Sequence, residues 1–261
     1  MNNFPKRLIS VCLVAVTAAG LFGCVLPSGG AGGGTLGDFG SYTGINDKIA
    51  DFTSGPAFDV FRASSGYGNG GMFDCDWTNN NAVYSGETES LNMKITNGGN
   101  KIYGAEYQSH NSYDHGYFSA RLKAIKRNGI VTSFFTYTSR PQWDEIDIEI
   151  LGKDTTKVQF NYFTNGVGKH EFLYDLGFDA SEGFHEYGFK WESDKITWYV
   201  DGKGVYCVTE NIPVSKTQIM FNVWNGKSEG ESNIKNWLGV YDKSDYSEAV
   251  AEYKWVAYRE L

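Results

Sequence analysis

Alternating acidic and apolar residues mark the part of this sequence best suited to chemistry. The stretch reads Trp143-Asp144-Glu145-Ile146-Asp147-Ile148-Glu149-Ile150-Leu151. Side chains of an extended strand alternate between its two faces, so Glu145, Asp147 and Glu149 share one face and the isoleucines share the other. Three carboxylates side by side repel one another, and this arrangement stabilises nothing unless the charges are used or neutralised. The strand is therefore our candidate site.

The spacing of the two glutamates suits glycosidic bond cleavage. A rise of ~3.3 Å per residue separates their Cα atoms by ~13 Å, and side chains leaning together would bring the carboxyls within roughly 5–6 Å. Retaining glycosidases hold their nucleophile and acid/base at about this distance, whereas inverting enzymes need roughly 6.5–9.5 Å. Asp147 is shorter, so we expect it to hydrogen-bond the nucleophile and to titrate with both glutamates as a coupled set.

Two other interpretations of the acidic strand stay open. A solvated surface explains most acid pairs on strands, although it does not explain three acids opposite an unbroken isoleucine face. A calcium site also gathers oxygen ligands, but it usually takes loop carbonyls at irregular spacing. This regular strand offers neither.

The strand and its continuation, Leu151-Gly152-Lys153-Asp154-Thr155-Thr156-Lys157-Val158-Gln159-Phe160-Asn161-Tyr162, resemble the active-site strand of bacterial lichenases. These are endo-β-1,3-1,4-glucanases of glycoside hydrolase family 16, and the resemblance covers residues 52–258. It implies that Glu145 is the nucleophile, Glu149 the acid/base and Asp147 an assisting residue. It also implies a two-sheet antiparallel β-sandwich, a concanavalin-like jelly roll with a concave substrate cleft, acting on mixed-linkage β-glucan without a cofactor.

A glucan cleft needs flat apolar surfaces for the sugar faces and amides for the hydroxyls. Trp143 lies two residues before Glu145, so its spacing alone places it on the acidic face. The resemblance implies the remaining substrate contacts. It also shows Gln108 where relatives commonly have Arg, and Phe163 where many have Tyr. The expected substrate-binding residues are Asn69, Phe73, Glu106, Phe135, Tyr137, Trp143, Asn161, Phe163, Asn222, Trp224 and Trp237.

The elements that position these residues are predicted to be strands. The chain has 261 residues, 32 of them Gly and 16% aromatic, and no long stretch repeats apolar residues at helical spacing. Many short strands joined by turns favour one all-β domain, which we place at residues 45–261. Asp201-Gly202 is a hairpin signal within it.

Charge restricts the partners of this domain. From Cys24 onward the chain carries 21 basic and 31 acidic residues, a net charge of −10. Such a surface repels phosphate backbones, so nucleic acid is excluded as a partner, whereas neutral polysaccharide is compatible with it. We expect a monomer.

The N-terminus has the pattern of an exported protein. Residues 1–23 have a basic start followed by a short apolar run, which predicts a signal peptide. Leu21-Phe22-Gly23-Cys24 resembles a bacterial lipobox, and this implies a lipid on Cys24, although Phe22 is atypical there. Residues 24–44 have the composition of a Gly/Ser-rich tether. The alternatives are a protein anchored at the cell envelope by this lipid, which would be its only membrane contact, and one released outside the cell.

We assign no catalytic role to cysteine, histidine or a bound metal. The resemblance places Cys75 where many lichenases have half of a disulfide, but Gly104 occupies the partner position, which leaves Cys207 as the other candidate. The four His residues show neither ligand spacing nor a nearby acid partner. Relatives bind a structural calcium through a carboxylate where this chain has Lys254, so we expect that site to be empty or weakened. We predict no metal.

Three other functions compete with mixed-linkage hydrolysis. An endo-β-1,3-glucanase of the same family usually has one more residue between the Asp and the second Glu, which this strand lacks. A transglycosylase would lengthen acceptor sugars instead of releasing reducing ends. A non-catalytic carbohydrate-binding module could use the same sandwich, and it would bind glucan equally well in Glu145→Gln.

Overall fold

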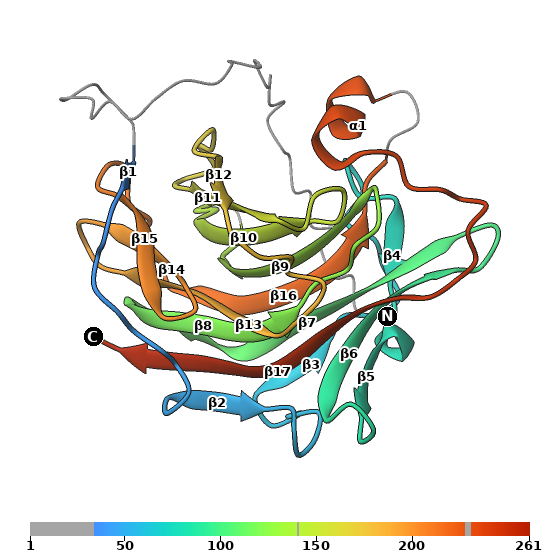
Figure 1. Ribbon diagram of the computed structural model, residues 1–261, viewed down its shortest axis with the longest axis horizontal. Coiled ribbons are helices and arrows are strands. Elements are labelled where there is room, and N and C mark those ends of the chain that lie inside the picture. Colours follow the sequence, from blue (N-terminus) through green and yellow to red (C-terminus); the bar gives the residue numbers. More distant parts are fainter. Residues whose placement is uncertain (1–33, 140, 228–230) are drawn as a thin grey trace.

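Two antiparallel sheets face one another in the computed structural model, which describes residues 34–139, 141–227 and 231–261 (Figure 1). The first layer contains seven strands in the pairing order β12 (Phe172–Asp175), β11 (Lys157–Phe163), β10 (Glu145–Leu151), β9 (Ile130–Tyr137), β16 (Thr217–Asn225), β7 (Ile102–Tyr113) and β3 (Phe61–Ala63). This is the layer that carries the acidic strand.

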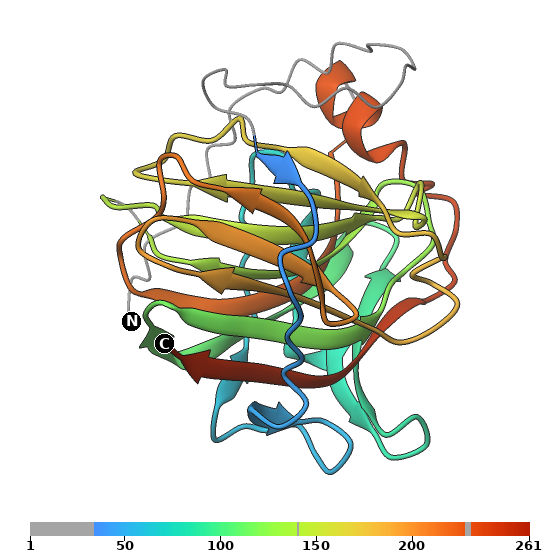
Figure 2. The ribbon, with the colours of Figure 1, turned by 60° about the vertical axis from the view of Figure 1, so that its left-hand side comes forward.

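The second layer lies in front of the first in the turned view (Figure 2). Its order is β1 (Thr35–Leu36), β15 (Lys203–Val208), β14 (Ile196–Val200), β13 (His185–Trp191), β8 (Gly116–Lys123) and β17 (Ala249–Glu260). Strands β2 (Lys48–Asp51) and β6 (Ser90–Asn97) both pair with β17, and β5 (Ala82–Ser85) pairs with β6. The predicted all-β sandwich is confirmed.

Three short elements complete the domain. The hairpin from β6 to β7 joins the two layers, and β4 (Cys75–Trp77) runs parallel to β7. A 3-10 turn, η1 (Asn79–Asn81), follows β4, and the single α-helix among the described residues is α1 (Ser232–Leu238). In that part of the chain, no helix combines the length and apolar character needed to cross a membrane.

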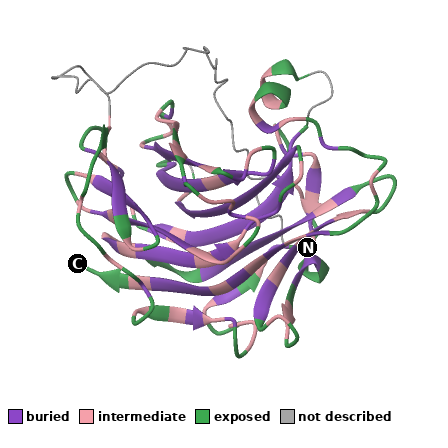
Figure 3. Ribbon diagram, viewed as in Figure 1, coloured by how far each residue is buried: buried purple, intermediate pink, exposed green. Residues whose placement is uncertain are grey.

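The core lies between the layers, as the burial colours of Figure 3 show. Ile146, Ile148 and Ile150 are at most 1% exposed and belong to this core, together with Phe134 and Phe160 of the neighbouring strands. The alternation read from the sequence therefore sets which face of β10 points inward. Its acids face outward from the sandwich, on a surface we call the acidic face.

A tight turn joins β14 and β15 in the second layer. Asp201 and Gly202 both have positive φ values, 46° and 78°, and join β14 to β15. Two consecutive residues with positive φ are typical of the tight hairpin turn that matches strand twist. The hairpin predicted from Asp-Gly is confirmed.

The domain begins earlier than the expected boundary at residue 45. Thr35 pairs with Cys207 of β15, and the Gly44 N–H donates to Glu186 Oε1 at 2.7 Å. Residues 34–44 are therefore part of the sandwich rather than of a free tether. The expected signal peptide, Cys24 and the remainder of the tether lie outside the described residues.

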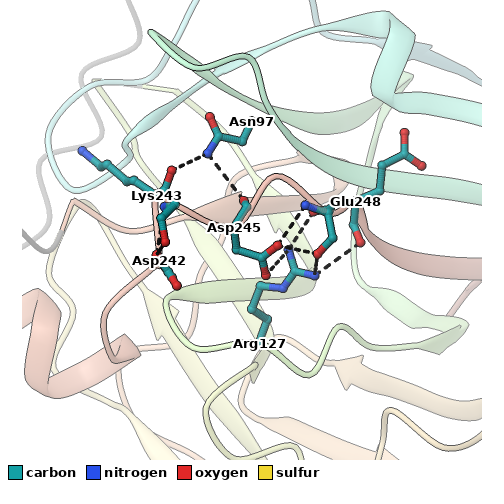
Figure 4. A network of polar contacts seen from close by, with 8 residues as sticks. Asn97, Arg127, Asp242, Lys243, Asp245 and Glu248 are labelled. Atoms are coloured by element: carbon teal, nitrogen blue, oxygen red, sulfur yellow. Dashed lines mark hydrogen bonds and ion pairs between the residues drawn. The ribbon is translucent and has the colours of Figure 1, made fainter.

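A polar network holds the segment that connects α1 to β17 (Figure 4). The Arg127 guanidinium donates to the carbonyls of Ser247 and Glu248 at 2.9 and 3.3 Å and pairs with Asp245 at 3.6 Å. Asn97 Nδ2 donates to the Lys243 carbonyl at 2.8 Å. These bonds hold the segment that follows α1, the helix that carries Trp237, a residue expected in the site.

Candidate active site

Strand β10 places the three acids in register with both neighbours. Glu145, Asp147 and Glu149 pair with Phe163, Asn161 and Gln159 of β11, and with Tyr137, Phe135 and Ser133 of β9. Neither pairing contains a register shift, so the strand is regular from Glu145 to Glu149. The sequence prediction of one acidic row on one face is confirmed.

Glu145 lies at the start of the strand and is 8% exposed. The indole Nε1 of Trp143 donates to its Oε2 at 2.8 Å. Burial raises the pKa of Glu145 to about 7, while hydrogen bonds from Trp143 and Asp147 act in the opposite direction. Donors that favour the charged form are what an attacking carboxylate requires.

Glu149 lies four residues further along the same face. Gln159 Nε2 donates to Glu149 Oε2 at 2.7 Å. Burial raises the pKa of Glu149 to about 8, and the charge of Glu145 adds to that increase. The carboxyl is thus protonated at neutral pH, as a general acid must be.

Asp147 lies between the two glutamates and is 5% exposed. Burial raises its pKa well above the usual range, and the charges of Glu145 and Glu149 raise it further. A hydrogen bond joins it to Glu145. A protonated Asp147 can donate that bond to the Glu145 carboxylate, which agrees with the assisting role expected from the sequence.

The row through Glu149 continues across the sheet as polar side chains. Asn222 of β16 pairs in register with Ser133 and with Glu106 of β7. Ser133 Oγ donates to Asn222 Oδ1 at 2.6 Å, and Asn222 Nδ2 lies 3.4 Å from Glu106 Oε2. Glu106 also accepts from Ser64 Oγ at 2.7 Å. Two expected substrate contacts, Glu106 and Asn222, therefore share one side-chain network with Ser133, the register partner of Glu149 on β9.

An apolar cluster borders Glu145 on the same face. It is separate from the core between the layers and contains Phe135, Tyr137, Trp143, Phe163 and Met220. Trp143 stacks on Phe163 with ring centroids 5.2 Å apart and planes inclined by 13°. Trp143 is only 4% exposed, so one side of the ring expected to stack on sugar already packs against Phe163.

Most of the remaining expected contacts lie at the Glu149 end of the face, and Asn161 lies beside Asp147. The Phe73 ring packs against Trp224 with centroids 4.1 Å apart and planes inclined by 36°, and the Trp224 and Trp237 centroids are 5.9 Å apart. Trp224 is 2% exposed and packs with the core, so it supports this end rather than forming an open surface. Asn69 uses its Oδ1 to accept from Trp77 Nε1 at 3.0 Å. Asn161 lies beside Asp147 in register, and it is 5% exposed.

Sequence reasoning missed Gln159, whose amide contacts Glu149. A hairpin centred on Asp154 places Gln159 opposite Glu149, so counting residues from the turn would have found it. It also missed Arg62, the register partner of Gln108. Arg62 donates to Gln108 Oε1 at 2.9 Å, which brings a guanidinium to the position where we expected only an amide. Long-range pairing of this kind leaves no local signal.

Asp144 is a third missed residue, and it fixes the loop that carries Trp143. Asp144 is fully buried and accepts the backbone N–H groups of Asn165, Val214 and Ser215 at 2.8, 3.0 and 2.9 Å. Trp143 has a φ of 40°, a sparsely populated conformation for a tryptophan. Such strain persists only where the surroundings impose it, and Asp144 supplies part of that constraint.

The residues around Lys254 do not fit a calcium ion. Lys254 Nζ donates to the carbonyls of Thr88 and Glu89 at 2.6 and 3.1 Å and lies 4.7 Å from the Phe184 ring centroid. The ammonium is thus hydrogen-bonded to carbonyl oxygens of the type that calcium would bind. Among the described residues, no group of three or more His, Cys, Asp and Glu side chains could hold a metal.

The two cysteines within the described residues, Cys75 and Cys207, are free thiols. Cys75 is buried, Cys207 is partly exposed, and they do not pair with each other. A Cβ atom added at Gly104 would lie 2.9 Å from Cys75 Sγ, so Gly104 faces Cys75 as the resemblance implied.

The prediction that no histidine has a nearby acid partner is wrong. His185 Nδ1 lies 2.7 Å from Asp201 Oδ2, and His115 Nδ1 lies 2.7 Å from Asp114 Oδ1. The pairing of His185 with Asp201 depends on the β13–β14–β15 sheet, which brings together residues far apart in the sequence. His115 follows its partner directly in the chain, so the sequence itself already placed an acid beside it.

Comparison with known proteins agrees with this geometry. The sequence model described as "Glycosyl hydrolases family 16" matches residues 69–247. A beta-glucanase of Paenibacillus macerans is 49% identical over 203 residues, which cover 76% of this chain and 82% of that protein. A xylanase/beta-glucanase of Ruminococcus flavefaciens is 46% identical over 220 residues, which are 80% of this chain and 26% of that longer protein.

A solved structure extends the agreement to the fold. It is a prokaryotic beta-1,3-1,4-glucanase (lichenase) derived from a mouse hindgut metagenome, 43% identical in sequence. The superposition has a TM-score of 0.74 and covers 81% of this chain and 98% of that one. Sequence and structure together show that this chain belongs to glycosyl hydrolases family 16.

Proposed function

We propose that this protein is a retaining endo-β-1,3-1,4-glucanase that hydrolyses mixed-linkage β-glucan. The observation that carries this proposal is the regular strand β10, in which the buried Glu145 and the partly exposed Glu149, four residues apart, share a face with an aspartate between them. Membership of family 16 and the beta-glucanase names of close relatives support glycosidase activity on β-glucan. Retention and the linkage preference are the finer parts of the proposal.

The chemistry follows from the two environments. Glu145, held by donors from Trp143 and Asp147, attacks the anomeric carbon while Glu149 gives its proton to the departing glycosidic oxygen. Forming the glycosyl-enzyme removes the charge of Glu145, which lowers the pKa of Glu149. Glu149 then takes a proton from water, whose oxygen attacks the anomeric carbon and releases Glu145.

The regularity of β10 favours mixed-linkage over β-1,3 specificity. A family 16 strand with one more residue between the aspartate and the second glutamate would need a shift in its pairing. Here β9 and β11 both pair with β10 without interruption from Glu145 to Glu149. The strand therefore has the spacing that its lichenase resemblance implies.

Purified protein assayed on barley β-glucan and on laminarin tests the proposal. We expect release of reducing ends from barley β-glucan, little or none from laminarin, and loss of activity in Glu145→Gln and Glu149→Gln. Glu182→Gln, which changes an exposed glutamate away from the acidic face, is the matched control and should keep activity. Preferential cleavage of laminarin would favour the β-1,3-glucanase. Equal binding by Glu145→Gln with no sugar released in any form would favour a binding module.

We also propose export, with a lipid on Cys24 and a monomeric catalytic domain. The basic, apolar and small-residue pattern of residues 1–24 supports this. Mass spectrometry of the mature N-terminus should detect a lipidated Cys24, and Cys24→Ala should release the enzyme from the membrane fraction. An unmodified N-terminus at another residue would contradict the anchor, and a dimer in solution would contradict the monomer.

A further inference from the structure

Gln159 connects the acid/base residue to helix α1. It is 4% exposed, and its two amide atoms have different partners. Its Nε2 donates to Glu149 Oε2 at 2.7 Å, and its Oε1 accepts from the Trp237 indole at 3.0 Å. The side chain therefore forms a two-bond bridge from a helix to the carboxyl that must exchange protons.

The indole determines which way the amide points. Trp Nε1 can only donate, so the atom of Gln159 that faces it must be the carbonyl oxygen. The NH₂ group is then left facing Glu149. A rotated amide would place two donors against each other at Trp237, which a buried site does not tolerate. Trp237 thus determines that Gln159 presents its NH₂ group to Glu149, although Trp237 itself does not contact that carboxyl.

Helix α1 has a second connection to the same hairpin. Lys153, in the turn between β10 and β11, donates from Nζ to the Asn236 carbonyl at 2.8 Å. The Arg127 network holds the segment after the helix (Figure 4). Trp237 is partly exposed, and it is one of the expected sugar contacts. Helix α1 is therefore joined to the β10–β11 hairpin at two points, by Lys153 at Asn236 and by Gln159 at Trp237.

We propose that Gln159 is a positioning residue for Glu149, and that the Trp237 indole N–H holds the Gln159 amide in its working orientation. This inference rests on the proposed acid/base role of Glu149. The consequence is a link between helix α1 and the protonation of Glu149. A sugar or a mutation that moves Trp237 should therefore alter proton transfer by Glu149.

The alkaline limb of the pH profile reports this link. Burial and the charges of Glu145 and Glu171 raise the pKa of Glu149, and the Gln159 bond lowers it, while Asp147 is the other acid on this face of the strand. Removing the bond to a charged group is expected to move the limb upward by about one pH unit. Misplacing the carboxyl should also lower kcat about tenfold to hundredfold.

The test is a double-mutant cycle on kcat/KM for barley β-glucan against pH. Gln159→Leu should shift the alkaline limb upward, Trp237→Phe should shift it in the same direction while keeping an aromatic ring, and the double variant should match Gln159→Leu alone. Trp191→Phe is the matched control, because it removes another buried indole N–H, bonded to the Pro213 carbonyl at 2.9 Å, away from the site. It should lower the melting temperature and leave the limb unchanged.

The outcomes separate this inference from the proposed function. Wild-type activity in Glu149→Gln would overturn the acid/base assignment itself. If Glu149→Gln is inactive but neither Gln159→Leu nor Trp237→Phe moves the limb, the positioning role is contradicted while the function stands. If the effects of Gln159→Leu and Trp237→Phe add in the double variant and those of Trp237→Phe are confined to KM, Trp237 acts on the sugar alone and the link to Glu149 is contradicted. Melting curves confirm that each variant is folded, and the two single variants lie on different elements, so loss of one leaves the other informative.

Discussion

Three carboxyls on one strand behave differently because their neighbours differ. Glu145 receives donors from Trp143 and Asp147, whereas Glu149 receives one from Gln159 and experiences the charge of Glu145. Burial raises both pKa values, to about 7 for Glu145 and about 8 for Glu149. The donors that favour the charged form of Glu145, and the charge that disfavours ionisation of Glu149, support the proposed order, in which Glu145 ionises first as the nucleophile and Glu149 stays protonated as the acid.

The pH profile of the wild-type enzyme follows from this order. Activity needs Glu145 ionised and Glu149 protonated, so kcat/KM should rise as pH increases through about 7 and fall as pH increases beyond about 8. These values belong to the coupled cluster rather than to isolated residues. Steady-state kinetics from pH 5 to 10 measures both limbs, and a profile flat across pH 6 to 9 would contradict the assignment.

Trp143 offers a second test at this scale. Its indole lowers the pKa of Glu145, so Trp143→Phe should move the acid limb upward by about one pH unit and reduce the maximum rate. The alkaline limb should move less than the acid limb, because it reports mainly on Glu149 within the coupled cluster. A change in KM with both limbs unchanged would show that Trp143 contacts only sugar.

At the scale of elements, the loop before β10 is as important as the strand. Asp144 holds three backbone N–H groups from two loops, and it carries the strained backbone of Trp143. Asp144→Ala leaves those buried donors without their acceptor. We expect the melting temperature to fall by roughly 5–10 °C, with a loss of kcat because Trp143 moves. Asp144→Asn keeps one acceptor oxygen, so its melting temperature should lie between those of Asp144→Ala and the wild type. Unchanged melting curves would show that the loop is held by other contacts.

Much of the arrangement of strands and turns around the site was predictable from the periodicity of side chains and from the residues in the turns. The alternation in the acidic strand gave its two faces, and Asp201-Gly202 gave a hairpin, because both depend on neighbouring residues. Gln159 was predictable in principle from the hairpin around Asp154. Arg62 beside Gln108 and Trp237 beside Gln159 were not, since each pair depends on how distant strands or a helix pack. The strand pairing of residues 34–44 was missed because their composition is that of a linker.

At the scale of the whole molecule, one ammonium group lies at the position where the lichenase resemblance implies a metal-binding carboxylate. Lys254 of β17 joins the carbonyls of Thr88 and Glu89, next to the start of β6. Since the charge is covalently attached, the sandwich should need no calcium at this position. The stability of the fold is then independent of the metal content of the medium.

Thermal unfolding with and without chelator measures this independence. Wild-type protein should melt at the same temperature in EDTA and in millimolar calcium, and Lys254→Met should melt about 2–4 °C lower in both. Lys254→Asp is the matched variant, because it supplies a carboxylate near two carbonyls and should be stabilised by calcium. A wild-type melting temperature that falls in EDTA would show that a metal binds despite Lys254.

The central claim is that Glu145 and Glu149 act together in a double displacement. Proton NMR of the first products from mixed-linkage glucan, recorded before mutarotation, tests it most directly. The account predicts that the new reducing ends appear first as the β-anomer. Initial release of the α-anomer would mean a single displacement by water and would contradict it.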